Sequence, residues 1–240
     1  MRPSGQEGHG YPTADAIFDA AVADLHAGCD AQRPLRPQVV FEDVPAPRRL
    51  APHAAAIGAT VRAADAGPQE QADIALGRFV LLYDPDGQPG WGGPFRVVAY
   101  IRADVEPEIA ADPLLGTVGW SWLTEALDAR AAGYAAPSGT VTRVVTEGFG
   151  GKQDEPTATG LELRASWSPT GPPPAAPGGG SARSPVPPLP APPLAGHVAA
   201  WCDALCAAAG LPPAAAGVSV LPRPRRRPGR RACRDRKSHV

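Results

Sequence analysis

Two runs, RFVLLYD at residues 78–84 and FRVVAYIR at residues 95–102, decide the fold that the sequence predicts. Both runs are rich in β-branched and aromatic residues, which favour strands. Between them lie Pro85-Asp86-Gly87 and a glycine-rich loop, a combination typical of a turn. The two runs therefore predict a hairpin with an enlarged turn. Because residues 78–84 are apolar on both faces, we expect this strand to lie in the middle of a sheet.

A second hairpin is expected from residues 139–148 and 160–168, joined by the loop at residues 149–159. The strands at 95–102 and 160–168 both alternate between apolar and polar side chains, the pattern of a sheet with one buried and one solvated face. The expected buried positions are Phe95, Val97, Ala99, Ile101, Leu161, Leu163, Ala165 and Trp167.

Apolar residues at helical spacing predict four helices. Thr13 is expected to cap the first helix, and Gly28 to end it. The second helix is expected over residues 50–61. Asp112, followed by proline, predicts the start of the third helix, which continues to about residue 133. The fourth covers residues 198–209. The positions that predict the second helix are Leu50, Ala54, Ile57 and Val61.

With one further short strand at residues 38–42, these elements predict an α+β fold. It consists of a mainly antiparallel sheet of four to five strands with helices packed on one face. The predicted organisation is a disordered N-terminus at 1–12, an α+β domain at 13–168, a Pro/Gly-rich linker at 169–193, a C-terminal helix at 194–222 that docks back on the domain, and a disordered basic tail at 223–240.

The formal net charge of -1 hides a strong asymmetry along the chain. Residues 223–240 hold nine Lys or Arg residues and one acidic residue, Asp235, which leaves 14 basic and 23 acidic residues upstream. An acidic body argues against a domain that grips a phosphate backbone, since that function needs a basic surface. Nucleic acid binding is therefore expected through the tail only, if it occurs.

Several classes of protein and site are excluded by pattern. The N-terminus MRPSGQEGHGYP lacks the apolar core of a signal peptide, and no run is long enough for a membrane span, so we expect a cytoplasmic protein that contacts no membrane. Cys202 and Cys206 lie four residues apart, but no second pair completes a zinc site. The run GWSWL at 119–123 lacks the closing glycine of a nucleophile elbow. We therefore expect no cofactor, no metal and no catalytic residue.

The most informative candidate site is the solvated face of the predicted sheet. Arginines on a rigid sheet can hold a carboxylate or a phosphate through paired hydrogen bonds. The alternative is a solvated face whose Arg–Glu pairs bind nothing. The candidate ligand-binding residues are Arg96, Tyr100, Arg102, Arg143, Glu147, Glu162 and Arg164, with Arg143 and Arg164 as the main anion anchors.

Three functions remain open. The first is a non-enzymatic cytoplasmic binding or regulatory module that takes a protein or a small anionic ligand on the arginine face. The second is an enzyme for an anionic small molecule, with Glu147 or Glu162 as the acid or base. The third is an RNA-associated protein that works through the basic tail.

Several segments of the sequence, taken together and in order, resemble the domain of unknown function 3000 family of high-GC Gram-positive bacteria. The resemblance covers about residues 13–222, while the Pro-rich insert and the basic tail depart from it. It implies no activity and no catalytic residue. The segments are PAPRRLAP (45–52), GRFVLLYDPDGQ (77–88), DPLLGTVGWSWLTEAL (112–127), SGTVTRVVTEGFGG (138–151), ELRASWSP (162–169) and AWCDALCAAAGLPP (200–213).

Overall fold

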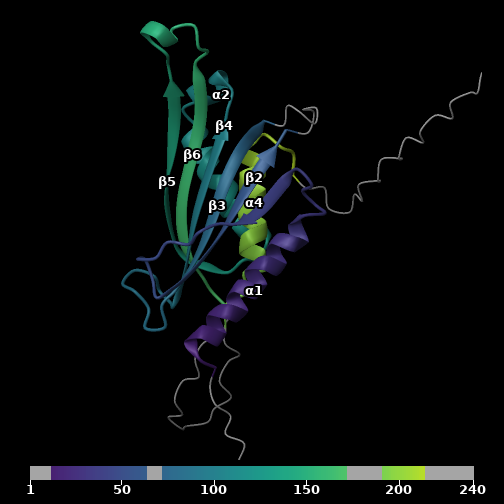
Figure 1. Ribbon diagram of the computed structural model, residues 1–240, viewed down its shortest axis with the longest axis vertical. Coiled ribbons are helices and arrows are strands. Elements are labelled where there is room, and N and C mark those ends of the chain that lie inside the picture. Colours follow the sequence, from purple (N-terminus) through teal and green to yellow (C-terminus); the bar gives the residue numbers. More distant parts are fainter. Residues whose placement is uncertain (1–11, 64–71, 172–190, 214–240) are drawn as a thin grey trace, which may run out of the picture.

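A computed structural model describes residues 12–63, 72–171 and 191–213 of the chain (Figure 1). These residues form one six-stranded sheet and four α-helices, which confirms the α+β fold but adds a strand to the four or five expected. The strands are β1 (Val39–Asp43), β2 (His53–Arg62), β3 (Asp73–Tyr83), β4 (Phe95–Asp104), β5 (Tyr134–Thr146) and β6 (Ala158–Pro169). The helices are α1 (Ala14–Gln32), α2 (Pro107–Ala111), α3 (Leu115–Ala129) and α4 (Ala195–Ala208), with a short 3-10 turn η1 (Gly150–Lys152).

The sheet is antiparallel throughout, with the strand order β1-β2-β3-β4-β6-β5. The first predicted hairpin is confirmed as β3 and β4, whose register places Tyr83 opposite Phe95. β3 has a neighbour on each side, as its two apolar faces predicted. The second predicted hairpin is β5 and β6, with Thr142 opposite Glu162.

The predicted helix at residues 50–61 is wrong, because this segment forms β2. Its alanines favour a helix locally, but β2 pairs along its length with β3 on one side and, over residues 57–61, with β1 on the other. Both of its faces carry buried residues, Ala56 on one and Ile57 on the other. Pairing with distant strands therefore overrides the helix propensity of the segment. This is the strand that the expected count lacked.

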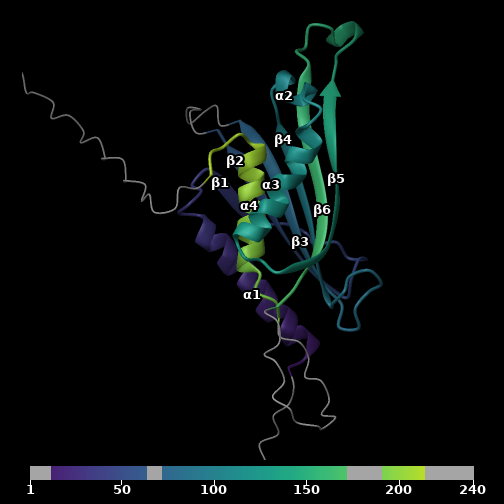
Figure 2. The ribbon, with the colours of Figure 1, turned by 180° about the vertical axis from the view of Figure 1, so that it is seen from behind.

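The helices cover one face of the sheet. α4 lies between α1 and α3, and Figure 2 shows α3 and α4 in front of the strands. Trp201 of α4 is fully buried and packs on Phe79 of β3, with 5.6 Å between the ring centroids. Phe79 in turn contacts Trp167 of β6 edge-on. These aromatic side chains join the C-terminal helix to the middle of the sheet.

The first helix begins where the sequence predicts and ends later. The Thr13 hydroxyl accepts a hydrogen bond from the Ala16 amide at 3.2 Å, which caps α1. Gly28 does not end the helix, which continues to Gln32. A Cβ atom at Gly28 would lie 3.0 Å from the Ala195 Cα atom, so this glycine instead permits the close approach of α1 and α4. Asp112 lies between α2 and α3, where it accepts a hydrogen bond from the Leu114 amide.

Residues 1–11, 172–190 and 214–240 lie outside the described part of the chain. The predicted N-terminal disorder up to residue 11, residues 172–190 of the predicted linker, residues 214–222 of the predicted C-terminal segment and the predicted basic tail fall there. In the described ranges, we find no helix with the length and apolar character needed to cross a bilayer.

Candidate functional site

The face of the sheet opposite the helices, which we call the open face, is partly covered by loops. Ala56, Val80 and Leu82 form a small buried cluster there, with Trp91 packed against it. Trp91 belongs to the loop between β3 and β4, and the segment after β1 contributes further apolar contacts to the same cluster. The end of the open face next to the loop between β3 and β4 is therefore a second, minor core. The rest of the open face stays accessible.

The accessible part forms a groove of about 670 Å³ that crosses β1, β2, β3, β4 and β6. Its volume lies within the range typical of small-molecule sites. The floor is largely apolar and the rim is charged. The side chains that line it are Glu42, Val44, Thr60, Leu76, Arg78, Val98, Tyr100 and Arg164, and the small residues Gly58, Ala59, Gly77 and Ala99 complete the lining.

One row of cross-strand neighbours supplies most of the polar groups of the groove. The strand register places Glu42 opposite Gly58, Gly58 opposite Arg78, Arg78 opposite Tyr100, and Tyr100 opposite Arg164. A Cβ atom at Gly58 would lie 3.2 Å from the Glu42 Cγ atom, so the glycine leaves room for the Glu42 side chain to lean over β2. Paired residues of adjacent strands face the same side of a sheet, so this row presents its charges together.

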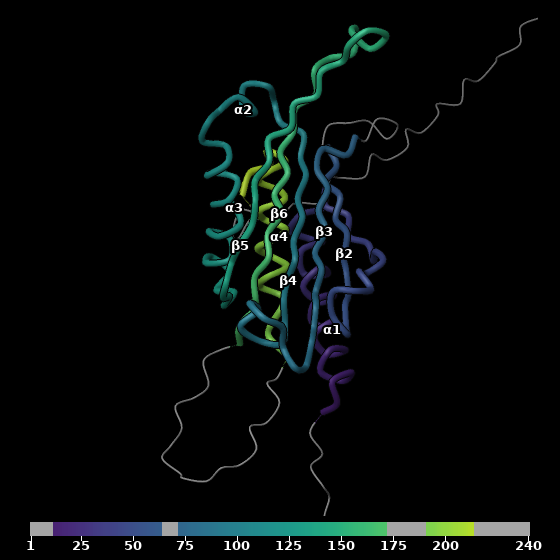
Figure 3. Tube along the Cα trace, turned by 90° about the vertical axis from the view of Figure 1, so that its left-hand side faces the viewer, coloured from purple at the N-terminus to yellow at the C-terminus, as the bar shows by residue number. Residues whose placement is uncertain are grey.

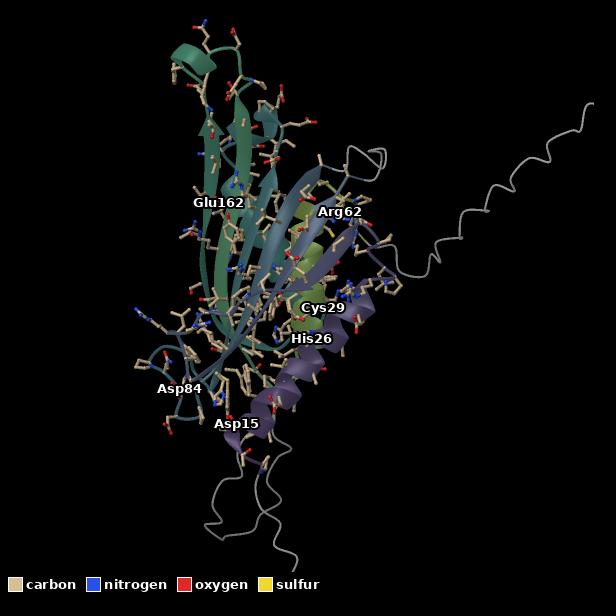
Figure 4. The ribbon with its side chains drawn as sticks, in the orientation of Figure 1. Asp15, His26, Cys29, Arg62, Asp84 and Glu162 are labelled. Atoms are coloured by element: carbon tan, nitrogen blue, oxygen red, sulfur yellow. The ribbon has the colours of Figure 1, made fainter. Side chains whose placement is uncertain are left out.

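Tyr100, Glu162 and Arg164 form a connected group at one end of the groove. An Nη atom of Arg164 donates to the Glu162 carboxylate at 3.0 Å, and the Arg164 guanidinium lies over the Tyr100 ring, 5.7 Å from its centroid. Burial raises the pKa of the Tyr100 phenol, and its hydrogen bond to Glu162 raises it further. Figure 4 shows Glu162 on β6, on the open face. The Glu162 charge is thus already balanced within the protein.

Arg78 is a groove residue that the sequence analysis missed. It is exposed and, within the described ranges, has no carboxylate within ion-pair distance. The signal was present in the sequence, since Arg78 is in phase with Val80 and Leu82 on the non-helix face of β3. The neighbouring residues 79–83 are all apolar, so the strand as a whole has the pattern of a buried one. Glu42, at the end of the short strand β1, was missed because so short a strand gives little alternation to read.

Four of the predicted site residues are brought together. Tyr100, Arg102, Glu162 and Arg164 all lie on the open face, where Tyr100 is opposite Arg164 and Arg102 is opposite Glu162. Arg102 is exposed beside the groove. The predicted alternation of β4 and β6 is therefore confirmed, and it places these groups as expected.

Arg96 lies on the same face but is buried, with 8% of its surface exposed. Its guanidinium donates to the Ala136 carbonyl at 3.0 Å and to the Ser166 hydroxyl at 2.7 Å. It also donates to the hydroxyls of Ser138 and Ser168 at 3.3 Å. Its two terminal nitrogens thus find four acceptors inside the protein. Arg96 joins β4, β6 and the irregular start of β5, where the register shifts between Ala135 and Ser138.

Replacing Arg96 with lysine is expected to lower the free energy of unfolding by roughly 1–2 kcal/mol. A single ammonium group cannot reach acceptors that are spread around a planar guanidinium. Urea denaturation of both proteins would measure the difference. Unchanged stability would show that these four hydrogen bonds contribute little.

Arg143 and Glu147 lie away from the other candidates, which corrects their expected position. Arg143 is opposite Leu161, a fully buried core residue, so its side chain leaves β5 on the helix face. Its guanidinium donates to the Asp112 carbonyl at 3.2 Å. Glu147 follows the end of β5 and is exposed. The reason is the register between β5 and β6. Thr142 lies opposite Glu162 on the open face, and the next residue of a strand, Arg143, points to the other face.

The other motifs lie in ordinary structural settings. Cys202 and Cys206 are buried in α4 and face the core. In the part of the chain that the structure describes, no three His, Cys, Asp or Glu side chains are grouped so that they could hold a metal ion. The loop at residues 148–152 contains η1 between β5 and β6.

Comparison with known proteins places the chain in a family without assigning a function. No curated protein and no solved structure matches it. The model of the family "Protein of unknown function (DUF3000)" matches residues 14–219, which is most of the chain. The described sheet and all four helices lie within that match. The chain therefore belongs to the DUF3000 family.

Proposed function

We propose that this chain is a non-enzymatic cytoplasmic binding or regulatory module whose open-face groove takes a small anionic ligand with an apolar part. The observation that carries the proposal is the exposed Arg78, which lacks an ion-pair partner among the described residues and lies in the lining of the groove. A guanidinium without a counter-charge, next to an apolar floor, is suited to a carboxylate or phosphate attached to a hydrophobic group.

Arg78 and Arg164 flank Tyr100 from opposite sides along the cross-strand row. Their backbones are two strand spacings apart, a distance of about 10 Å. Both arginine side chains are long enough to reach one anionic group that lies between them. Tyr100 holds the Arg164 guanidinium through its ring. The apolar part of the ligand would lie over Leu76, Val98 and Val44, which line the same groove.

The alternative of an enzyme that uses Glu147 or Glu162 has less support. Glu162 lies in an ion pair with Arg164, whose guanidinium donates to the carboxylate at 3.0 Å, so this carboxylate is already engaged within the protein. Glu147 is exposed in the loop beyond β5 and does not line the groove. These positions favour binding over acid–base chemistry.

A double substitution tests the proposal. The probe is 8-anilinonaphthalene-1-sulfonate, an anionic and apolar fluorophore, titrated into the full chain. Arg78→Ala with Arg164→Ala is expected to weaken its binding at least about tenfold, since two charged hydrogen-bond donors are lost. The melting temperature should stay close to that of the unmodified protein, because both side chains are exposed.

A matched double variant controls for net charge. Arg62→Ala with Arg143→Ala removes the same charge outside the groove lining and should leave probe binding unchanged. Octanoate should displace the probe and octanol should not, because only octanoate carries the anionic group. Equal probe binding by the two double variants, or displacement by octanol as effective as by octanoate, would contradict the proposal.

A further inference from the structure

The outer edge of the sheet at β5 is long and unpaired within the described part of the chain. β5 pairs only with β6 there, and from Ser138 to Thr146 its register is regular. None of these nine residues is buried, and Val145 is 58% exposed. Figure 3 looks onto this edge, with α3 to one side of β5 rather than in front of it. An edge of this kind presents a row of free backbone donors and acceptors.

The opposite edge of the same sheet is protected. β1 has only five residues, and its last two are Glu42 and Asp43. Short length and charged residues are the usual means by which proteins prevent edge strands from pairing with other chains. Residues 138–146 of β5 have one charged side chain, Arg143, whose guanidinium is directed to the Asp112 carbonyl. Of the two edges, only the one at β5 lacks this protection.

We propose that the β5 edge is a dimer interface, and that a second copy of this chain pairs its own β5 antiparallel across a two-fold axis. The two sheets then form one continuous sheet through backbone hydrogen bonds, the mode of association called β-augmentation. A two-fold interface uses the same residues from both copies, so the strand must be complementary to itself.

The register centred on Thr142 satisfies this requirement. It pairs all nine regular residues and stops before the irregularity at Ala135–Ser138. Thr142 then lies opposite Thr142 of the second copy, a favourable pair in sheets. Arg143 lies opposite Val141 of the second copy, so no like charges lie directly opposite one another. Val145 lies opposite Gly139 of the second copy, where a Cβ atom would lie 2.6 Å from the Trp120 ring, so the valine faces a glycine that is covered by this ring.

The dimer also brings the open faces of the two copies to the same side of the joined sheet. A two-fold axis perpendicular to the sheet keeps residues of equal parity on one face. Thr140, at the β5 end of the row that contains Arg164, would lie opposite Val144 of the second copy. The two grooves would therefore open on one surface, separated by the paired β5 strands.

Charge substitutions at the two-fold axis test this interface in the full chain. The unmodified protein should show concentration-dependent dimerisation by analytical ultracentrifugation. Thr142→Lys and Thr142→Glu should each weaken dimerisation at least about tenfold, because each places like charges directly opposite one another. An equimolar mixture of the two variants should recover heterodimers, visible by native mass spectrometry. This recovery also separates a lost interface from a lost fold.

Thr146→Lys is the matched control, since it makes the same substitution on the same strand and face. In the proposed register position 146 lies opposite Ser138 of the second copy, so the added charge meets no like charge and dimerisation should change little. The proposal is overturned if the unmodified protein stays monomeric at the highest concentration that remains soluble. It is also overturned if Thr142→Lys has no effect, or if the mixture forms no heterodimer.

Discussion

Replacing Asp203 with alanine is expected to lower the free energy of unfolding by about 3–5 kcal/mol. The Asp203 carboxylate lies on α4 and contacts arginines that follow two other helices. Arg36, beyond the end of α1, donates to it at 3.2 Å. Arg130, at the end of α3, donates to its other oxygen through two nitrogens, at 2.6 and 2.8 Å. One carboxylate therefore joins the three long helices that cover the sheet.

The size of the effect comes from the arginine that would be left behind. The Arg36 side chain is only 5% exposed, and its one other hydrogen-bond acceptor in the described residues is the Pro212 carbonyl, at 2.7 Å. Removing the carboxylate leaves a buried positive charge that water cannot solvate. Removing a partner of a buried ion pair is far more costly than removing a partner of an exposed one.

The control is Asp30→Ala, which removes the carboxylate of the exposed Arg33–Asp30 pair. We expect that variant to lose no more than about 1 kcal/mol. Urea denaturation followed by circular dichroism measures both. A similar loss of stability in the two variants would show that the Asp203 network is no more important than a surface ion pair.

Acidification from pH 7 to about pH 4 is expected to remove about 3 kcal/mol of stability through His197 alone. His197 is fully buried, and burial lowers its pKa from 6.5 to about 4. The unfolded chain therefore binds a proton at this side chain before the folded protein does. The contribution to stability is fully present above pH 6.5, is lost as the pH falls toward 4, and changes no further below that value.

The geometry of the ring explains why the proton is unfavourable. The Trp167 indole N–H donates to Nδ1 of His197 at 3.0 Å, which places the proton of the neutral ring on Nε2. Nε2 is buried and has no hydrogen-bond partner among the described residues. A second proton would have to be added at Nδ1, where it would break the bond to Trp167 and leave an unpaired charge in the core.

Comparing the unmodified protein with His197→Asn isolates this effect. Asparagine keeps an acceptor near the position of Nδ1 but does not titrate. The free energy of unfolding, measured by urea denaturation between pH 7 and pH 4, should fall less in the variant by about 3 kcal/mol. Equal pH dependence of the two proteins would assign the acid sensitivity to other groups. The readout is the slope against pH, so it is independent of any constant loss of stability in the variant.

Two predicted elements show where local pattern is sufficient and where it fails. The alternation in Phe95–Asp104 identified both the strand and its buried face, because a period of two is a local property of the chain. The segment His53–Arg62 has the same length, yet its small residues fit a helix equally well. Only pairing with β1 and β3 decides its conformation, and those partners are separate segments of the chain.

The candidate site divides in the same way. Tyr100, Arg102, Glu162 and Arg164 could be placed on one face because two short strands alternate cleanly. The face of Arg143 depends on the register between β5 and β6, and a shift of one residue reverses it. That register is set by packing along the whole hairpin and cannot be counted from the loop between the strands.

Local patterns in the sequence are sufficient to predict the two hairpins, the buried face of β4 and β6, the cap of the first helix and the α+β class. Each of these follows from contacts between residues close in the chain or from a short periodic pattern. The tertiary structure alone decided that β6 lies beside β4, that Gly28 is a helix contact and that Arg78 joins Arg164 in one groove. Those features depend on which distant segments meet, and the free energy that selects them comes from burial and pairing summed over the whole fold.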